Sequence, residues 1–135
     1  MTFLLDTNVI SETWKPRPHP GVRAWLEARG AECGIPAPVM AEIADGIHAQ
    51  SGIRREVLLA RLNVFLGEWS GQLVPWDTAA AIEWGKQQHS VAVKRQPQPL
   101  WDSILEAMTL SRGLVLVTRN TEDFRRASTL NPWLE

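Results

Sequence analysis

Short apolar segments alternate with helical segments along this chain, and the alternation restricts the folds open to it. The strand candidates are five short runs: TFLLD (2–6), ECGIPA (32–37), QLVPW (72–76), LVLVT (114–118) and LNPWLE (130–135). Runs of this length and composition, separated by helical patterns, form βαβ units with a parallel sheet. Helices then cover both faces of that sheet. The sequence therefore predicts an α/β fold, with one domain over residues 1–135 and no internal repeat.

The segments between these runs have the apolar spacing of helices. They are VISETW (9–14), VRAWLEARG (22–30), PVMAEIADGIHAQ (38–50), IRREVLLARLNVFLGEW (53–69), residues 77–88, LWDSILEAMTLSRG (100–113) and TEDFRRA (121–127). Thr7 and Asn8 are candidate caps for the first helix, and Asp77 for the fifth. Residues 91–99 are predicted to be irregular, because Pro97 and Pro99 cannot lie inside a helix.

Composition narrows the class of protein. The chain has 14 basic and 15 acidic residues, so only a local basic patch would attract nucleic acid. No apolar run approaches the roughly 18 residues of a membrane span, and Asp6 interrupts the apolar start in a way that a signal peptide does not. Cys33 is the only cysteine, which excludes an internal disulfide and fits a reducing cytosol. We therefore expect a cytoplasmic protein that does not enter a membrane.

Four carboxylates are expected near one edge of the sheet, where ligands bind in such folds. Asp6 follows the first strand and Asp123 follows LVLVT, while Glu42 and Asp102 lie near the starts of two helices. No matched cluster of cations accompanies them. Carboxylate oxygens without cationic partners favour a hard divalent cation, Mg²⁺ or Mn²⁺.

Each acid also has a simpler interpretation. Asp6 lies among apolar residues, where an acid is costly unless paired or exposed at a strand end. Asp102 can stabilise its helix through the dipole. Asp123 lies three residues after Asn120, the spacing of a helix cap.

For Glu42, helical periodicity favours a solvated position. Met40, Ile43 and Ile47 form an apolar stripe, and Glu42 falls on the far side of it. If Val39 faces the core instead, Glu42 lies on the flank of the buried face.

Other catalytic chemistries find little support. The histidines lie in different segments without the spacing of metal ligands, and we interpret them as surface or packing residues: His19, His48 and His89. Candidate nucleophiles have no evident histidine partner: Ser11, Ser103 and Thr118.

Four motifs together resemble a known family. LLDTNVISE, MAEIADG, WDSILEAMTL and LVLVTRNTEDF, the last followed by NPW, are similar to PIN-domain ribonucleases of the VapC and FitB type. These are toxins of bacterial type II toxin–antitoxin pairs. The resemblance covers nearly the whole chain, and DTNVIS and TRNTEDF are its most specific parts. It implies a five-stranded parallel sheet with helices on both faces.

The resemblance also implies a set of site residues. The acidic quartet of the family corresponds to Asp6, Glu42, Asp102 and Asp123, with metal held by Asp6, Asp102 and Asp123. Asn8 matches a residue that orders the first acid. Polar residues that line the site correspond to Thr118 and Asn120. For Glu42 the resemblance overrides the periodicity.

One position departs from the family pattern. Small apolar residues usually follow the third acid, and here Glu106 interrupts them. Two interpretations stay open: Glu106 is an additional acid that supports the site, or it is the partner of a nearby arginine.

The activity that the resemblance implies is metal-dependent hydrolysis of RNA phosphodiester bonds, in tRNA or another structured RNA. The implied partners are a VapB-type antitoxin and a second copy of the chain, with residues 57–69 and 15–21 as candidate surfaces. Seven tryptophans can serve the core or such an interface. Candidate contacts to RNA phosphates are Lys94, Arg95, Arg112, Arg119, Arg125 and Arg126.

Three alternatives remain at this stage. The chain is a catalytically inactive PIN-like interaction module, or a related nuclease that acts on DNA. An aspartyl-phosphate receiver or phosphatase is the third, although DTNV supplies only one of the acids that such a site needs.

Overall fold

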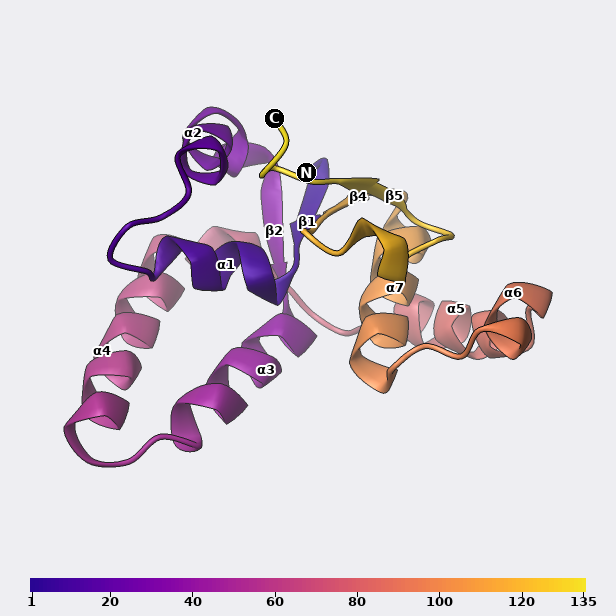
Figure 1. Ribbon diagram of the computed structural model, residues 1–135. Helices are drawn as coiled ribbons and strands as arrows, with labels where there is room; N and C mark the ends of the chain where they lie inside the picture. The colour runs from indigo at the N-terminus through magenta and orange to yellow at the C-terminus, as the bar shows by residue number, and fades with distance from the viewer.

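A five-stranded parallel sheet forms the centre of the protein (Figure 1). The computed structural model describes all residues, 1–135. The strands are β1 (Phe3–Leu5), β2 (Cys33–Pro36), β3 (Leu73–Val74), β4 (Val115–Val117) and β5 (Ser128–Leu130), in the order β3-β2-β1-β4-β5. Every neighbouring pair is parallel. The predicted α/β fold and the implied sheet are both confirmed.

Strand β1 lies in the middle of the sheet. Its Phe3 pairs with Cys33 of β2 on one side and with Val115 of β4 on the other. The chain runs outward from β1 to β3 and then returns past β1 to β4. The connections on either side of β1 therefore leave in opposite directions, which makes the carboxyl ends of β1 and β4 the switch point where such sheets bind ligands.

Helices flank the sheet on two sides. They are α1 (Thr7–Thr13), α2 (Pro20–Arg29), α3 (Ala37–His48), α4 (Gly52–Glu68), α5 (Thr78–Gln88), α6 (Val91–Arg95) and α7 (Leu100–Arg112), with three short 3-10 turns: η1 (Gly30–Glu32), η2 (Ser70–Gln72) and η3 (Thr121–Asp123). Figure 1 shows α1, α2 and α4 on one side and α5, α6 and α7 on the other. Right-handed crossovers explain this, because the connections to β2 and β3 run in one direction along the sheet and the connection to β4 runs back.

Local sequence fixes several helix ends as expected. The Asp77 carboxylate accepts a hydrogen bond from the Ala80 N–H at 2.9 Å and caps α5. Gly113 ends α7 in the left-handed conformation, with φ of 63°. His19 has a more specific role than predicted, because its Nδ1 accepts from the Gly21 N–H and caps α2.

The tryptophans divide between core and surface. Trp25 is buried, and its ring meets Phe3 edge-on at 5.0 Å between centroids. Trp76 and Trp101 are 39% and 45% exposed. Cys33 is fully buried in the core cluster. None of the helices combines the length and apolar character needed to span a bilayer.

Three local predictions were wrong. Residues 91–95 are helical as α6, because Ser90 caps them and the first proline comes only at Pro97. The helix predicted over 121–127 is only the turn η3, since the N–H groups of Arg126 and Ala127 bond to a side chain. The last strand is Ser128–Leu130 instead of residues 130–135, because Asn131 and Pro132 follow it and proline has no N–H to pair.

Candidate active site

Asp6 is fixed at the end of β1 by three donors. Its Oδ1 accepts from the Thr7 N–H at 2.7 Å, which makes Asp6 the cap of α1 in place of the predicted Thr7 or Asn8. Its Oδ2 accepts from the Thr118 hydroxyl at 2.8 Å and from Asn8 Nδ2 at 3.2 Å. Asp6 is only 8% exposed. Its carboxylate is therefore held in one orientation, with a lone pair left over on Oδ1.

Burial and hydrogen bonding act in opposite directions on this carboxyl. Burial raises the pKa of Asp6, the bonds from Thr118, Thr7 and Asn8 lower it, and the charge of Asp123 raises it again. The net pKa is raised. Hydrogen bonds to a charged group contribute about 1.5–3 kcal/mol each, yet here they do not offset the loss of water.

Asn8 and Thr118 join the ends of β1 and β4. Asn8 Nδ2 donates to the Thr118 hydroxyl at 3.2 Å, and Asn8 Oδ1 accepts from the Arg119 N–H at 3.2 Å. Thr118 is fully buried, and its oxygen also accepts from the Asn120 N–H at 3.1 Å. The structure thus places three predicted site residues around Asp6, although Asn120 contributes its backbone and not its side chain.

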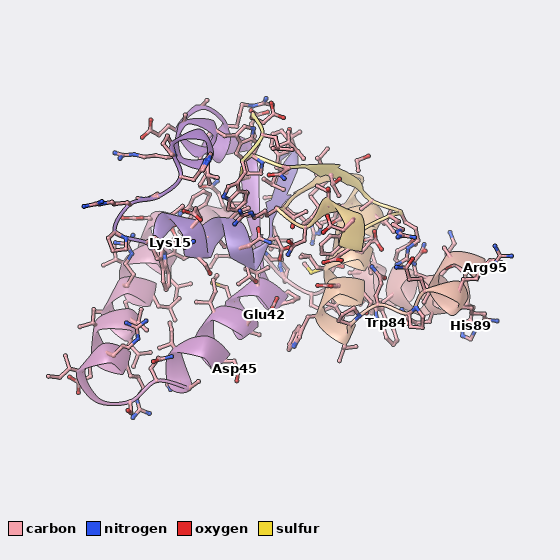
Figure 2. All side chains as sticks on the ribbon, in the orientation of Figure 1. Lys15, Glu42, Asp45, Trp84, His89 and Arg95 are labelled. Carbon is pink, nitrogen blue, oxygen red and sulfur yellow. The ribbon has the colours of Figure 1, made fainter.

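Glu42 faces the same region from α3. The buried stripe of α3 is Val39, Ile43 and Ile47, so the far-side position favoured by periodicity was wrong and Glu42 lies on the flank. Its Oε1 accepts from the Thr7 hydroxyl at 3.0 Å. Burial raises the pKa of Glu42, and the charge of Asp6 adds to that shift. Figure 2 shows Glu42 between α1 and the start of α3.

Thr7 is a site residue that sequence reasoning missed. Its N–H binds Asp6 and its hydroxyl binds Glu42, so one residue orients two acids. The only hint in the sequence was a hydroxyl residue directly after the first acid, which we interpreted as a helix cap.

The pKa of Asp102 reflects the charges of the acids around it. This residue lies in the first turn of α7 and is partly buried. Burial, and then the charges of Asp6, Asp123, Glu42 and Glu106 in that order, together raise its pKa from 3.8 to about 6. The four predicted acids therefore share one electrostatic environment, although they come from four separate segments.

Asp123 ends the turn η3 and is exposed. Its N–H donates to the Asn120 carbonyl at 3.0 Å, but the Asn120 side chain makes no capping bond, so that part of the predicted cap is absent. The Asp123 carbonyl accepts from Gln98 Nε2 at 2.9 Å.

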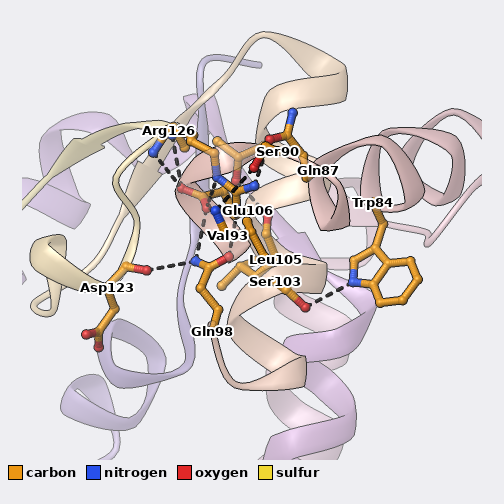
Figure 3. Close-up of polar contacts among 12 residues, drawn as sticks. Trp84, Gln87, Ser90, Val93, Gln98, Ser103, Leu105, Glu106, Asp123 and Arg126 are labelled. Carbon is orange, nitrogen blue, oxygen red and sulfur yellow. Dashed lines mark hydrogen bonds and ion pairs between the residues drawn. The ribbon is translucent and has the colours of Figure 1, made fainter. Parts of the chain in front are cut away.

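Glu106 is the partner of an arginine. It is completely buried and forms an ion pair with Arg126. Of the two interpretations that the sequence left open, the arginine partner is the one observed (Figure 3).

The six candidate cations differ in their availability. Arg112 is paired with Asp77 at 2.9 Å, Arg126 is paired with Glu106, and the Arg119 guanidinium lies over the Trp133 ring at 5.2 Å. Lys94 is exposed on α6. Arg95 and Arg125 line a cavity of about 230 Å³ together with Asp123, and neither forms an ion pair.

The acids fit a loosely held divalent cation. No three acid, histidine or cysteine side chains stand close enough to form a complete protein cage. Mg²⁺ typically takes one or two carboxylates and keeps several waters, so it does not require such a cage. The mutual repulsion seen at Asp102 is relieved by a bound cation. Oxygen-only ligands and excess negative charge are the chemistry that such an ion needs.

Comparisons with known proteins agree with this arrangement. The sequence model of the PIN domain matches residues 3–130. VapC ribonuclease Y4jK of Sinorhizobium fredii is 31% identical over 136 residues, which cover 97% of each chain. Toxin FitB of Neisseria gonorrhoeae is 30% identical, covering 97% of this chain and 98% of that protein.

Solved structures show the same fold. The FitAcB complex of Neisseria gonorrhoeae superposes with a TM-score of 0.87 at 28% identity, covering 98% of this chain and 99% of that one. DNA-bound VapBC of Salmonella typhimurium gives a TM-score of 0.81 at 25% identity, with 98% of each chain covered. With its fold, its acids and these relatives in agreement, the chain belongs to the PIN-domain family, in the group that contains VapC and FitB.

Proposed function

We propose that this protein is a metal-dependent endoribonuclease, the toxin of a type II toxin–antitoxin pair, which hydrolyses phosphodiester bonds of RNA. The observation that carries the proposal is the set of four acids near the carboxyl ends of β1 and β4, where burial and the charges of the neighbouring acids raise the pKa of Asp102 to about 6. Relatives named as a VapC ribonuclease and as a tRNA(fMet)-specific endonuclease VapC support the reaction and the RNA class.

In the proposed mechanism, Asp6, Asp102 and Asp123 would hold Mg²⁺ or Mn²⁺, directly or through bound waters. When bound, the ion supplies a positive charge for the scissile phosphate and lowers the pKa of a water. The hydrogen bonds from Thr7, Asn8 and Thr118 keep the Asp6 carboxylate oriented throughout the reaction. Preorganised groups of this kind are a major source of catalytic rate.

Glu42 is the proposed general base. It is only partly buried, its pKa is raised, and the Thr7 hydroxyl fixes its position beside Asp6. A carboxylate with a raised pKa accepts a proton from an attacking water more readily at neutral pH. We infer in-line attack on phosphorus, with a 5′-phosphate and a 3′-hydroxyl as the product ends.

RNA reaches the acids past the cavity lined by Arg95 and Arg125. These guanidiniums are free to bind phosphates, and Asp123 lines the same cavity. The other candidate arginines are engaged by Asp77, Trp133 and Glu106. We therefore assign the main phosphate contacts to Arg95 and Arg125, with Lys94 beside them on α6.

The antitoxin is proposed to occupy an apolar groove on the other side of the sheet. A cavity of about 410 Å³ lies between α1, α2 and α4, and Trp14, Leu26 and Val64 are among its lining residues. Charged side chains at its rim, such as Arg61 and Glu68, suit an amphipathic segment. Solved complexes of FitAB and VapBC support such a partner, and we propose that the chain is also a homodimer within that assembly.

An inactive interaction module is the second candidate. The groove would favour it if the acids were poorly placed, but the three bonds that hold Asp6 and the bond that holds Glu42 favour catalysis.

The first test is metal-dependent cleavage. The purified chain, freed of any antitoxin, is incubated with tRNA and single-stranded RNA in Mg²⁺, Mn²⁺ or EDTA. We expect cleavage only with a metal ion, and a loss of about 10²–10³ in rate for Asp6→Asn, since one preorganised polar group has about that effect. Asp45→Asn, an exposed acid on α3, is the control and should cut normally. A folded wild type that binds metal and cuts neither RNA would instead support the inactive module.

The second test uses the raised pKa of Asp102. An acid with a raised pKa in the folded state binds more protons there than in the unfolded state, so its contribution to stability falls as pH rises between about 4 and 6. In metal-free buffer, Asp102→Asn should therefore gain stability relative to the wild type across this range. Urea unfolding at pH 4, 5, 6 and 7 measures the difference. A difference that does not change with pH would argue against the shared electrostatic environment.

The third test concerns the RNA contacts. Replacing Arg95 and Arg125 together by Ala should weaken RNA binding at all sequences and reduce the slope of log K against log salt by about 1 for each lost phosphate contact. Arg54→Ala, at the exposed start of α4, is the matched control. Binding is measured with the catalytically impaired Asp6→Asn chain, so that no RNA is cut. An unchanged slope would show that Arg95 and Arg125 do not contact the RNA phosphates.

The fourth test places the antitoxin. Val64 is 57% exposed and lines the groove, whereas Val57 is 61% exposed on the same helix and lies outside it. With the cognate antitoxin, Val64→Lys should weaken binding at least about tenfold, because burying an unpaired charge is costly. Val57→Lys should bind normally in the same calorimetric titration. Equal effects of the two substitutions would exclude the groove.

A further inference from the structure

One buried carboxylate connects segments that the catalytic proposal leaves unexplained. Glu106 lies one helical turn after Asp102 on α7 and is completely buried. Its Oε2 accepts from the N–H groups of Arg126 and Ala127, both at 3.0 Å. Its Oε1 accepts from Arg126 Nε and Gln98 Nε2, also at 3.0 Å, and from Arg126 Nη2. Five donors from two separate segments thus meet at one side chain.

Arg126 is engaged at every nitrogen of its guanidinium. Nε and Nη2 bind Glu106, Nη1 donates to Gln87 Oε1 at 2.7 Å, and Nη2 also donates to Gln98 Oε1. Its side chain is only 17% exposed. Arg126 is therefore not available for an RNA phosphate, and its function lies within the protein.

Gln98 connects this ion pair to the active site. Its Nε2 donates both to Glu106 and to the backbone carbonyl of Asp123, at 2.9 Å. Figure 3 shows Gln98 between Asp123 and the Glu106–Arg126 pair, while the Asp123 carboxylate points away from them. The Asp123 side chain is thus left free while its backbone is held.

The turn that carries Asp123 has few other supports. It is a three-residue 3-10 turn, held by the bonds from the Asp123 N–H to Asn120 and from the Phe124 N–H to Thr121. Phe124 is buried, but Asp123 itself is exposed. Exposed turns with few hydrogen bonds open easily.

We propose that Gln98, Glu106 and Arg126 form a positioning clamp, which holds the turn of Asp123 at a fixed place relative to Asp102 on α7. The clamp joins the two acids because Glu106 is on the same helix as Asp102, and Gln98 bonds to Asp123. The consequence for metal binding rests on the proposed function. None of the three residues contacts a reacting atom, so each acts through the acids.

A purely stabilising role is the competing explanation. A buried ion pair is weak evidence for stability, because the loss of water often cancels the attraction between the charges. A fully satisfied polar network instead fixes one geometry. This network lies between the third and fourth acids, Asp102 and Asp123. A fixed geometry at that place would affect metal binding.

The decisive variant is Gln98→Ala, because Gln98 is near the surface and its loss leaves the Glu106–Arg126 pair in place. Gln96→Ala is the matched control: the same change, two residues away, at an exposed side chain without a hydrogen bond. In the metal-free chain, amide exchange is measured by NMR at Asp123 and Phe124. The Thr7 amide, bound to Asp6, is the internal reference.

We expect Gln98→Ala to exchange about fivefold faster at Asp123 and Phe124, as the loss of one ordinary hydrogen bond predicts, with Thr7 unchanged. Calorimetry should show Mn²⁺ binding about tenfold weaker, the usual effect of losing a supporting contact. Gln96→Ala should match the wild type in both measurements. Equal exchange in the two variants, or an unchanged Mn²⁺ affinity in Gln98→Ala, would overturn the proposal.

A second variant tests the carboxylate itself. Glu106→Gln keeps the shape but turns an amide donor toward other donors. We expect faster exchange at Asp123 and also at Arg126 and Ala127, whose N–H groups bind Glu106 directly. Faster exchange at Arg126 and Ala127 alone would contradict the clamp. A wild type that binds no Mn²⁺ would refute the proposed function, whereas the exchange rates would still decide whether the clamp holds Asp123.

Discussion

The hydrogen bonds to Asp6 join the end of β1 to the end of β4 beside the other predicted site acids. The carboxylate follows β1, and its donors come from the start of α1 and from Thr118 at the end of β4. Without these donors an acid at the centre of an apolar sheet would move toward water or become neutral. With them, it stays at the end of β1, and the other acids are arranged around it.

The remaining acids differ in how their charge is balanced. Glu106 is the most buried, yet it has a complete set of donors and a guanidinium partner. Asp102 has no cationic partner and carries the effect of its neighbours in its raised pKa. The chain thus neutralises Glu106, which organises the structure, and leaves Asp102 without a cationic partner. Such a division is expected where some charges serve the fold and others serve a ligand.

Sequence reasoning was most successful where a single physical rule decided the outcome. Buried apolar runs at regular intervals predicted the parallel sheet, and the position of Asp6 after the first run predicted its place at the edge. Periodicity failed for Glu42, because the sequence favours a stripe through Met40, whereas packing buries the stripe through Val39.

The segment 121–127 failed for a different reason. Its residues favour a helix, but Glu106 takes the N–H groups that would continue it. That bond joins residues 20 positions apart in sequence, a separation at which no local pattern operates. Thr7 was missed because it binds two acids from different segments. The sequence shows that Thr7 follows Asp6, but it does not show that the Thr7 hydroxyl meets Glu42.

The four acids come from four segments that meet only when the crossovers between the strands have docked. A divalent cation that requires several of them therefore has little affinity for the unfolded chain, and its binding energy adds to the stability of the native state. The concentration of free ion would then set the fraction of molecules that are transiently open to proteases. In that way the acids proposed to serve hydrolysis would also link the cellular lifetime of the chain to its supply of metal.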